Sequence, residues 1–188
     1  MEEYSIKREL DAGEKILWQG KPKQGIIFRA LDILYIPFSV MWCGGAIAWM
    51  SGVLSITAKS QNHAAKLLPL FGIPFVLVGL YIMIGRFFVD AKIRANTDYA
   101  VTNERIIIAS GFSGRKIKSL SLKTLPVISL SEKPDGHGTL AFGDLTQFAT
   151  GARASGYWPG AASPSIFEMI PNVRDVETII RKAQREAV

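Results

Sequence analysis

Two long stretches without a charged side chain place the strongest limit on how this chain folds. Residues 33–58 and residues 67–85 contain no Asp, Glu, Lys or Arg over 26 and 19 positions. A helix of roughly 20 apolar residues crosses the hydrocarbon core of a bilayer, where it satisfies its own backbone hydrogen bonds. The sequence therefore predicts a two-helix transmembrane hairpin over residues 31–90, with spans at about 33–56 and 67–88.

Buried helices of a soluble core and a signal peptide are the alternatives for such apolar runs. Both runs exceed the usual length of a core helix. The first run follows about 30 residues that carry both signs of charge, and it is longer than the apolar part of a signal peptide. We therefore expect both segments to remain in the mature protein, with the lipid bilayer as their partner.

The distribution of Lys and Arg around the two runs predicts the orientation of the hairpin. Six of these residues precede the first run, two lie between the runs, and four follow the second run. Loops on the cytoplasmic side of a membrane carry the excess of Lys and Arg. We therefore expect the N and C termini in the cytoplasm and the short loop outside. The residues counted are Lys7, Arg8, Lys15, Lys21, Lys23 and Arg29, then Lys59 and Lys66, then Arg86, Lys92, Arg94 and Arg105.

Small residues in both runs predict how the two spans pack. Gly44, Ala48 and Gly52 repeat every four residues on one helical face, and Gly72 and Gly79 form a similar face in the second span. Helices in lipid approach closely along such faces because lipid supplies no hydrophobic drive for association. The alternative is that these glycines reflect the general composition of membrane helices.

Charged residues at the inner boundary of the spans predict a structural clasp. Arg29 and Asp32 are spaced for an i,i+3 pair, and Arg86 and Asp90 for an i,i+4 pair. A third arrangement joins Asp32 to Arg86 across the hairpin. An ionisable residue at a membrane edge can also mark an ion path, but no charge lies at mid-depth of either span.

From residue 97 the pattern changes to short β-strands. Runs rich in Val, Ile, Leu, Phe or Thr alternate with turn residues, and a final amphipathic run places apolar residues at helical spacing. The fold class expected is a membrane α-helical hairpin plus a mainly-β barrel or sandwich over residues 95–188, capped by a C-terminal helix. The strands are expected near 98–102, 105–110, 116–122, 126–132, 139–143 and 165–170.

Four segments resemble a known family in the order in which they occur. "YAVTNERIIIASGFSGRKIKSLSL" resembles the core of bacterial pleckstrin-homology-like domains, which open on a Y-x-[VIL]-T-x-x-R hairpin. "FEMIPNVRDVETIIRKAQ" is similar to their closing strand and helix, and "LDAGEKILWQGKP" resembles the lead-in of their membrane-anchored members. "GIPFVLVGLYIMIGRFFVDA" resembles the second span of those members. The resemblance implies a PH-like barrel in a multi-pass protein of the bacterial cytoplasmic (inner) membrane. It also implies a non-enzymatic interaction or scaffolding module that binds an unidentified protein partner or associates with itself.

The N-terminal segment, residues 1–30, is expected to contribute a strand. A PH-like barrel has seven strands, and only six follow the apolar runs. Residues 14–18, "EKILW", alternate as a strand does, and the hairpin returns the chain to the same side of the membrane. We therefore expect this segment to dock on an open edge of the β-domain. The alternative is that Trp18 anchors at the lipid headgroups.

A long loop, residues 144–164, contains further aromatic residues. Tyr157 and Trp158 rest on the domain or lie at the lipid interface, where Trp and Tyr collect, or else the loop is mobile.

No arrangement of residues indicates catalysis, a cofactor or a metal. The two histidines, His63 and His137, do not stand at metal-ligand spacing with Cys, Asp or Glu. No phosphate-binding or nucleophile motif is present. The net charge of +6 is explained by the residues that flank the spans, so we expect no nucleic-acid partner.

Basic residues on one hairpin predict an alternative function, the binding of anionic lipid headgroups. Arg115, Lys116, Lys118 and Lys123 lie within nine positions. Basic residues close to a membrane are attracted to anionic lipids. The other interpretation is that these lysines protect a strand edge against aggregation.

Overall fold

The computed structural model describes residues 6–29, 32–59, 61–63, 65–111, 114, 116–143 and 165–187. It divides into two compact units. Residues Ile26–Phe88 form the first, which we call the helical unit, and Met1–Gly25 with Val89–Val188 form the second, which we call the β unit. The N-terminal segment is therefore part of the β unit. Arg115, Tyr157, Trp158 and the loop 144–164 lie outside the described residues.

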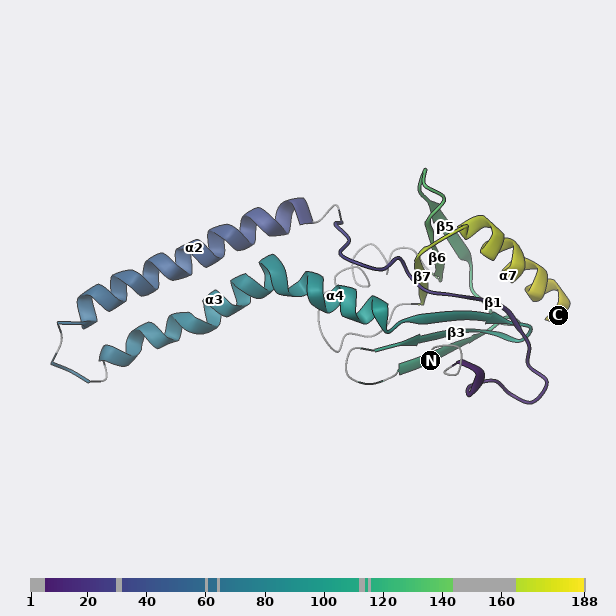
Figure 1. Ribbon diagram of the computed structural model, residues 1–188, viewed down its shortest axis with the longest axis horizontal. Coiled ribbons are helices and arrows are strands. Elements are labelled where there is room, and N and C mark those ends of the chain that lie inside the picture. Colours follow the sequence, from purple (N-terminus) through teal and green to yellow (C-terminus); the bar gives the residue numbers. More distant parts are fainter. Residues whose placement is uncertain are drawn as a thin grey trace. The chain divides into compact units, whose positions relative to one another are not determined.

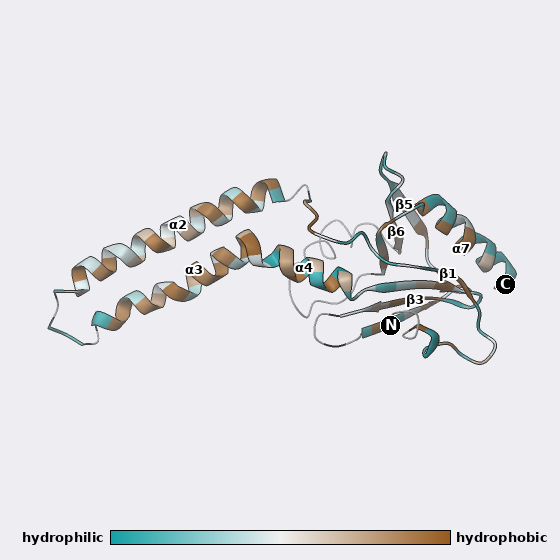
Figure 2. Ribbon diagram, in the orientation of Figure 1, coloured by the Kyte–Doolittle hydropathy of each residue, from teal (hydrophilic) through white to brown (hydrophobic). Residues whose placement is uncertain are grey.

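The helical unit contains the two apolar helices that the sequence predicts (Figure 1). The first is α2, Asp32–Thr57. The second runs through a 3-10 helix, η1 (Ala65–Gly72), α3 (Ile73–Leu80), a π-helical turn, η2 (Tyr81–Gly85), and α4 (Arg86–Ala95). The residues of α4 from Val89 onward belong to the β unit. Both helices are long and apolar enough to cross a membrane, and Figure 2 shows hydrophobic residues along α2 and α3.

The contact between the two helices involves only part of the predicted small-residue faces. A Cβ placed on Gly79 would lie 3.0 Å from Cys43 Cβ, and one on Gly72 would lie 2.9 Å from Met50 Sδ, so both glycines face α2 closely.

The prediction for the face of α2 was wrong. Gly44 and Gly52 have no neighbouring atom within 4 Å of an added Cβ, and Ala48 is exposed. The spacing of small residues identifies a smooth face of a helix, but it does not determine whether that face is turned to the neighbouring helix. Large side chains such as Trp42 and Met50 fill the contact with the second helix instead.

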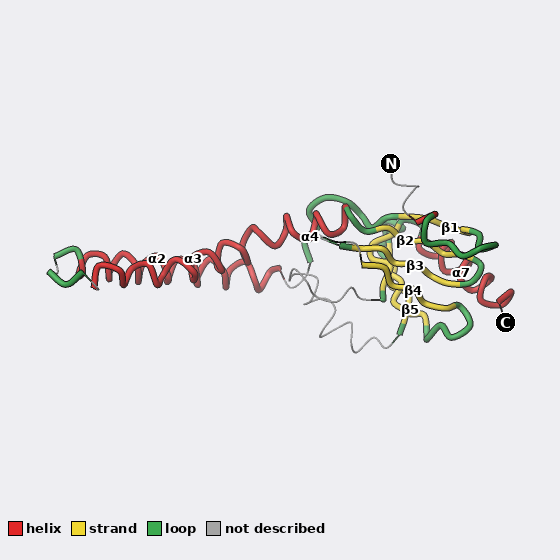
Figure 3. The backbone as a smooth tube through the Cα atoms, turned by 90° about the horizontal axis from the view of Figure 1, so that it is seen from below, coloured by secondary structure: helices red, strands yellow, loops and turns green. Residues whose placement is uncertain are grey.

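The β unit contains two antiparallel sheets and one helix. Strands β1 (Ile16–Gly20), β2 (Asp98–Thr102), β3 (Arg105–Ser110) and β4 (Lys116–Ser121) form a four-stranded sheet in the order β1-β2-β3-β4, as Figure 3 shows. Strands β5 (Ile128–Glu132), β6 (Gly138–Phe142) and β7 (Ile166–Ile170) form a three-stranded sheet in the order β5-β6-β7. Helix α7, Val173–Ala187, follows β7. These elements are consistent with a PH-like fold.

The core of the β unit lies between the two sheets and α7. Phe167 of β7 is fully buried at its centre, stacked on Tyr99 with ring centroids 4.6 Å apart and meeting Phe142 edge-on at 5.1 Å. Helix α7 covers this core with the apolar face that its periodicity predicts, which contains Val173, Val176, Ile180 and Ala183.

Docking of the N-terminal segment is confirmed. Strand β1 pairs antiparallel with β2, with Trp18 opposite Val101, although the register shifts between Ile16 and Trp18. The Trp18 ring packs against Phe167 at 5.5 Å, so its assignment as an interfacial aromatic was wrong. A ring that covers the core in this way stabilises the fold by burying a large apolar surface and by its contact with a second ring.

The outer face of the four-stranded sheet is covered as well. Ile6 of the N-terminal segment is fully buried against Ala100 and Ile107, and Leu10 and Ile16 pack around them. The N-terminal segment therefore contributes both an edge strand and an outer layer to the β unit.

Candidate functional site

The two sequence motifs on either side of the apolar helices meet at one buried carboxylate, Glu14. Its Oε1 accepts hydrogen bonds from the Thr102 hydroxyl at 2.6 Å and from Arg105 Nε at 3.0 Å. Its Oε2 accepts from Arg105 Nη2 and from the Asp11 backbone N–H, both at 2.9 Å. Burial acts to raise the pKa of Glu14, but the hydrogen bonds from Arg105, Thr102 and Asp11 outweigh it and hold the pKa below its ordinary value.

Arg105 joins the N-terminal segment at several further points. Its guanidinium contacts the Asp11 carboxylate at 3.0 Å and donates to the Glu9 carbonyl at 2.8 Å. The hydrogen bond to Glu14 raises the pKa of Arg105, so this side chain stays charged. A guanidinium whose N–H groups donate to several acceptors in this way holds β3 and the N-terminal segment together.

The turn between β2 and β3 is organised by the same network. The Thr102 hydroxyl accepts from the backbone N–H groups of Glu104 and Arg105, at 3.2 and 2.9 Å. Asn103 accepts from the Lys15 N–H through Oδ1 at 2.7 Å and donates its own N–H to the Lys15 carbonyl at 3.1 Å. These hydrogen bonds hold the β2–β3 turn in shape and join it to the N-terminal segment at Lys15.

Sequence reasoning missed this network, although the signal was present. Glu14 and Arg105 are charged residues inside the two segments that carry the family resemblance, 91 positions apart. Spacing along a chain does not reveal a pair of that separation.

Asp32, the first residue of α2, and Arg86, the first residue of α4, pair between the two apolar helices. The two charged atoms lie 2.9 Å apart, and only 4% and 3% of these side chains is exposed. Arg86 also lies over the rings of Tyr35 and Phe87, at 5.2 and 4.7 Å from their centroids. The Arg29 backbone N–H donates to the Asp32 carboxylate. Of the three charge pairs considered from the sequence, the pair of Asp32 with Arg86 is the one that joins the two helices.

Asp90, the fourth residue of the expected clasp, belongs to the β unit. Its carboxylate pairs with Arg94 at 2.9 Å, one turn further along α4. Arg94 donates in addition to the Gly25 carbonyl at 2.6 Å. The hydrogen bond to Gly25 ties the N-terminal segment to α4, and Asp90 is the charged partner of the Arg94 side chain that donates it.

The lysines expected to contact lipid headgroups do not form one patch. Lys116 and Lys118 lie opposite Ser110 and Ile108 on the face of β4 that is turned to the core, near the first residues of the strand. Lys123 lies two residues after Ser121, the last residue of β4, which places it beyond the opposite end of a strand roughly 20 Å long. The prediction of a single cluster was therefore wrong for Lys123, because an extended strand separates residues that are close in sequence.

A polar hollow of about 710 Å³ lies at the end of the sheet where Lys123 is found. It lies between the β2–β3 turn, the end of β4 and the last turn of α7, and it contains both signs of charge. Its lining includes Glu104, Ser119, Ser121, Lys123 and Glu186.

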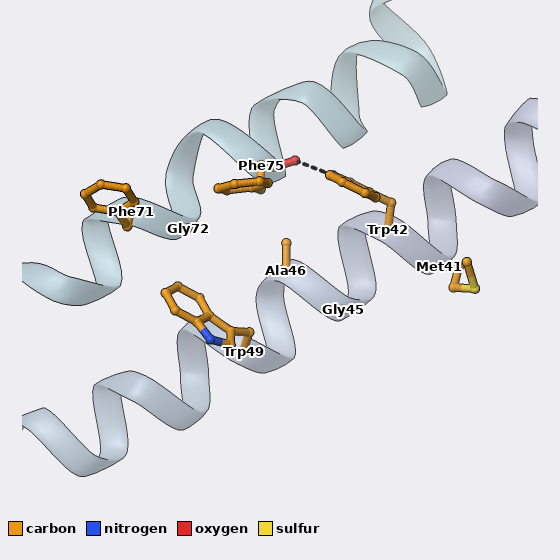
Figure 4. A pocket seen from close by; sticks show the side chains of 8 residues that line it. All are labelled: Met41, Trp42, Gly45, Ala46, Trp49, Phe71, Gly72 and Phe75. Carbon is orange, nitrogen blue, oxygen red and sulfur yellow. Dashed lines mark hydrogen bonds between the residues drawn. The ribbon is translucent and has the colours of Figure 1, made fainter.

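A second hollow, of about 610 Å³, lies between the two apolar helices and is lined by apolar residues (Figure 4). Trp42 and Phe75 face one another there, and Trp42 Nε1 donates to the Phe75 carbonyl at 3.3 Å. No titratable side chain lines this hollow, so its chemistry suits hydrocarbon and not a charged ligand. Among the described residues, no three or more His, Cys, Asp or Glu side chains are placed to hold a metal ion.

Comparisons with known proteins place the chain in a family. The protein-family model described as "Bacterial PH domain" matches residues 34–184, which confirms the resemblance found in the sequence. No curated protein and no solved structure matches the chain. Since the family match covers well over half of the 188 residues, the chain belongs to the bacterial PH domain family.

Proposed function

We propose that this protein is a non-enzymatic interaction module tethered to the bacterial cytoplasmic membrane. Its two apolar helices cross the membrane as a hairpin, both termini are in the cytoplasm, and the β unit binds a protein partner. Family membership indicates an interaction module. The hydrogen bonds of Glu14, Thr102 and Arg105 support a structural role for the charged motif residues instead of a catalytic one.

The pairing of β1 with β2 is the observation that carries this proposal. β1 precedes the first apolar helix and β2 follows the second, yet they are neighbours in one sheet. Two strands in one sheet are on the same side of a membrane, so the chain between them crosses an even number of times. Two candidate spans fit that requirement, and the excess of Lys and Arg on their outer flanks favours the cytoplasm for the β unit.

Cysteine labelling in intact cells tests the topology. In a Cys43→Ala background, single cysteines are placed at Gln61, in the loop between the helices, and at Ser131, exposed on β5. A membrane-impermeant thiol reagent is expected to label Gln61→Cys and to spare Ser131→Cys until the cells are opened. Labelling of Ser131→Cys alone in intact cells would refute the proposed orientation.

Photo-crosslinking in living cells tests the interaction. A photoreactive residue is placed in the full chain at exposed positions of the β unit, Leu17, Ser119 and Thr178, and in the loop at Gln61 as a control. A discrete cross-linked protein is expected from at least one position on the β unit and not from Gln61. Failure at every position on the β unit, with correct topology, would refute a protein-binding function.

Binding of anionic lipid is a second candidate, favoured by the position of two lysines. Lys116 begins β4 at the same end of the sheet as Gly20 and Asp98, the strand ends that connect along the chain to the apolar helices. Full-length protein in nanodiscs with and without anionic lipid is expected to differ in amide exchange at residues 116–118 if headgroups contact them. The double variant Lys116→Glu/Lys118→Glu should abolish that difference, whereas Lys182→Glu on α7 should keep it.

A further inference from the structure

The outer edge of β4 is an open strand edge of the β unit. The order of the four-stranded sheet places β4 at its end, and within the described part of the chain no strand pairs with its far side. Its residues are exposed or half-buried throughout. An edge strand presents backbone N–H and C=O groups to which another chain can add.

The hydrogen-bond pattern identifies which groups point to the open side. Leu122 N–H donates to the Glu104 carbonyl at 3.0 Å, at the end of the β3–β4 ladder. In an antiparallel pair the residues alternate between bonding their partner strand and pointing away from it. Leu120 and Lys118 therefore bond to β3, and the backbone groups of Ile117, Ser119 and Ser121 face outward.

The polar hollow provides room for an added strand beside these groups. Ser119, Ser121 and Lys123 line it on the β4 side, and Glu186 and Ala187 at the end of α7 line it on the other. A hollow of about 710 Å³ at this position leaves space beside Ser119 and Ser121.

The charge on β4 identifies the kind of strand that fits. Lys116 and Lys118 share one face of β4, and a strand added to its edge would place alternate side chains beside them. Acidic side chains at those positions would be attracted. A second copy of β4 would bring its own lysines to the same edge, which disfavours pairing between two copies of the chain.

We infer that β4 binds a partner by strand addition, and that the partner segment is an extended peptide with acidic residues at alternate positions facing Lys116 and Lys118. The segment runs antiparallel to β4, so it enters beside Ser121 and the end of α7 and ends beside Lys116. This inference rests on the proposed function and names how the β unit recognises its partner.

A tethered probe strand tests the inference in the full-length protein. Because the last turn of α7 lines the entrance to the hollow, a flexible Gly-Ser linker after the C-terminus can deliver a six-residue Thr-Glu-Thr-Glu-Thr-Glu strand at high effective concentration. Amide exchange at Ile117 and Ser121 is expected to slow roughly tenfold or more. A Thr-Lys-Thr-Lys-Thr-Lys strand on the same linker is expected to leave exchange unchanged. Equal slowing by both strands would overturn the inferred charge recognition.

Matched variants show whether the backbone edge and the lysines carry the effect. Ser119→Pro removes one outward N–H without removing a bond to β3 and should abolish the slowing at Ile117 and Ser121, whereas Ser119→Thr should keep it. Lys116→Glu/Lys118→Glu should transfer the slowing from the acidic to the basic strand, and Lys182→Glu should change nothing. Slowing that survives Ser119→Pro in a folded variant, judged by its thermal unfolding, would refute strand addition.

The outcomes separate this inference from the proposed function. If the acidic strand gives no slowing while photo-crosslinking from Leu17 or Thr178 still captures a partner, strand addition on β4 is refuted and the interaction function stands. If no position on the β unit captures a partner either, both are refuted.

Discussion

Replacing Glu14 by Gln tests whether the buried network holds the N-terminal segment on the β unit. Glutamine keeps one acceptor oxygen, which can serve Thr102 and Arg105 Nε. Its amide group cannot accept from Arg105 Nη2 or from the Asp11 N–H, as the carboxylate does at 2.9 Å. The variant therefore loses two hydrogen bonds and a negative charge at a position where the Glu14 side chain is fully buried.

The size of the effect follows from the exposure of the two partners. Breaking a fully buried ion pair costs about 3–5 kcal/mol, and a hydrogen bond to a charged group contributes about 1.5–3 kcal/mol. Arg105 is 25% exposed and retains Asp11 and the Glu9 carbonyl, which softens the loss. We expect Glu14→Gln to lower the free energy of unfolding of the β unit by about 2–3 kcal/mol at pH 7.

The pH dependence gives an independent check of the same network. The pKa of Glu14 in the folded protein lies below its ordinary value of 4.5. The carboxylate therefore stabilises the fold fully above that ordinary value, and its contribution is lost as pH falls through the lower, folded pKa. The difference in stability between the wild-type protein and Glu14→Gln should be constant near neutral pH and shrink under acid conditions.

Amide exchange of β1 and thermal unfolding in detergent, measured from pH 7 down to pH 3, provide the readouts. Glu186→Gln replaces an exposed glutamate in the same unit and should change stability by less than about 0.5 kcal/mol. A Glu14→Gln protein as stable as the wild type at pH 7, or a difference that grows on acidification, would contradict the assigned role.

Three further substitutions test the packing, each by thermal unfolding of the full-length protein. Asp32→Asn removes the counter-charge that lies 2.9 Å from the buried Arg86 and should lower the free energy of unfolding by about 3 kcal/mol. The exchange Asp32→Arg/Arg86→Asp should restore part of that stability, and an exchange that restores none would argue against the pair. Gly79→Leu forces a side chain into Cys43 and should destabilise the hairpin by about 1–3 kcal/mol. Gly44→Leu, whose Cβ has no neighbouring atom within 4 Å, should have little effect. Equal destabilisation by Gly79→Leu and Gly44→Leu would show that the helices pack through the face of α2 that contains Gly44. Gly138→Ala places a methyl group 2.5 Å from Val173 Cγ1 and 2.6 Å from the Ser131 carbonyl, so a loss of about 1–3 kcal/mol is expected; stability matching that of Gly114→Ala, where nothing is close, would contradict this register.

The sequence alone determined the features that depend on local pattern. The two charge-free runs identified both apolar helices, and alternation identified β1. Runs rich in Val, Ile, Leu, Phe or Thr between turn residues identified the strands from β2 to β7. The spacing of Val173, Val176 and Ile180 identified the buried face of α7. These inferences hold because the residues that share one face of a helix or strand recur at a fixed short spacing along the chain.

Only the tertiary structure decided what lies beside what. Three results show this: the helices meet through Trp42 and Met50 and not through the face of Gly44, Glu14 pairs with Arg105 from 91 positions away, and Lys123 lies a strand's length from Lys116. Each depends on strand register, on the rotation of a helix about its axis, or on the burial of a charge beside one particular partner. The free energies that select these arrangements come from packing and desolvation between segments distant in sequence, so no local pattern records them.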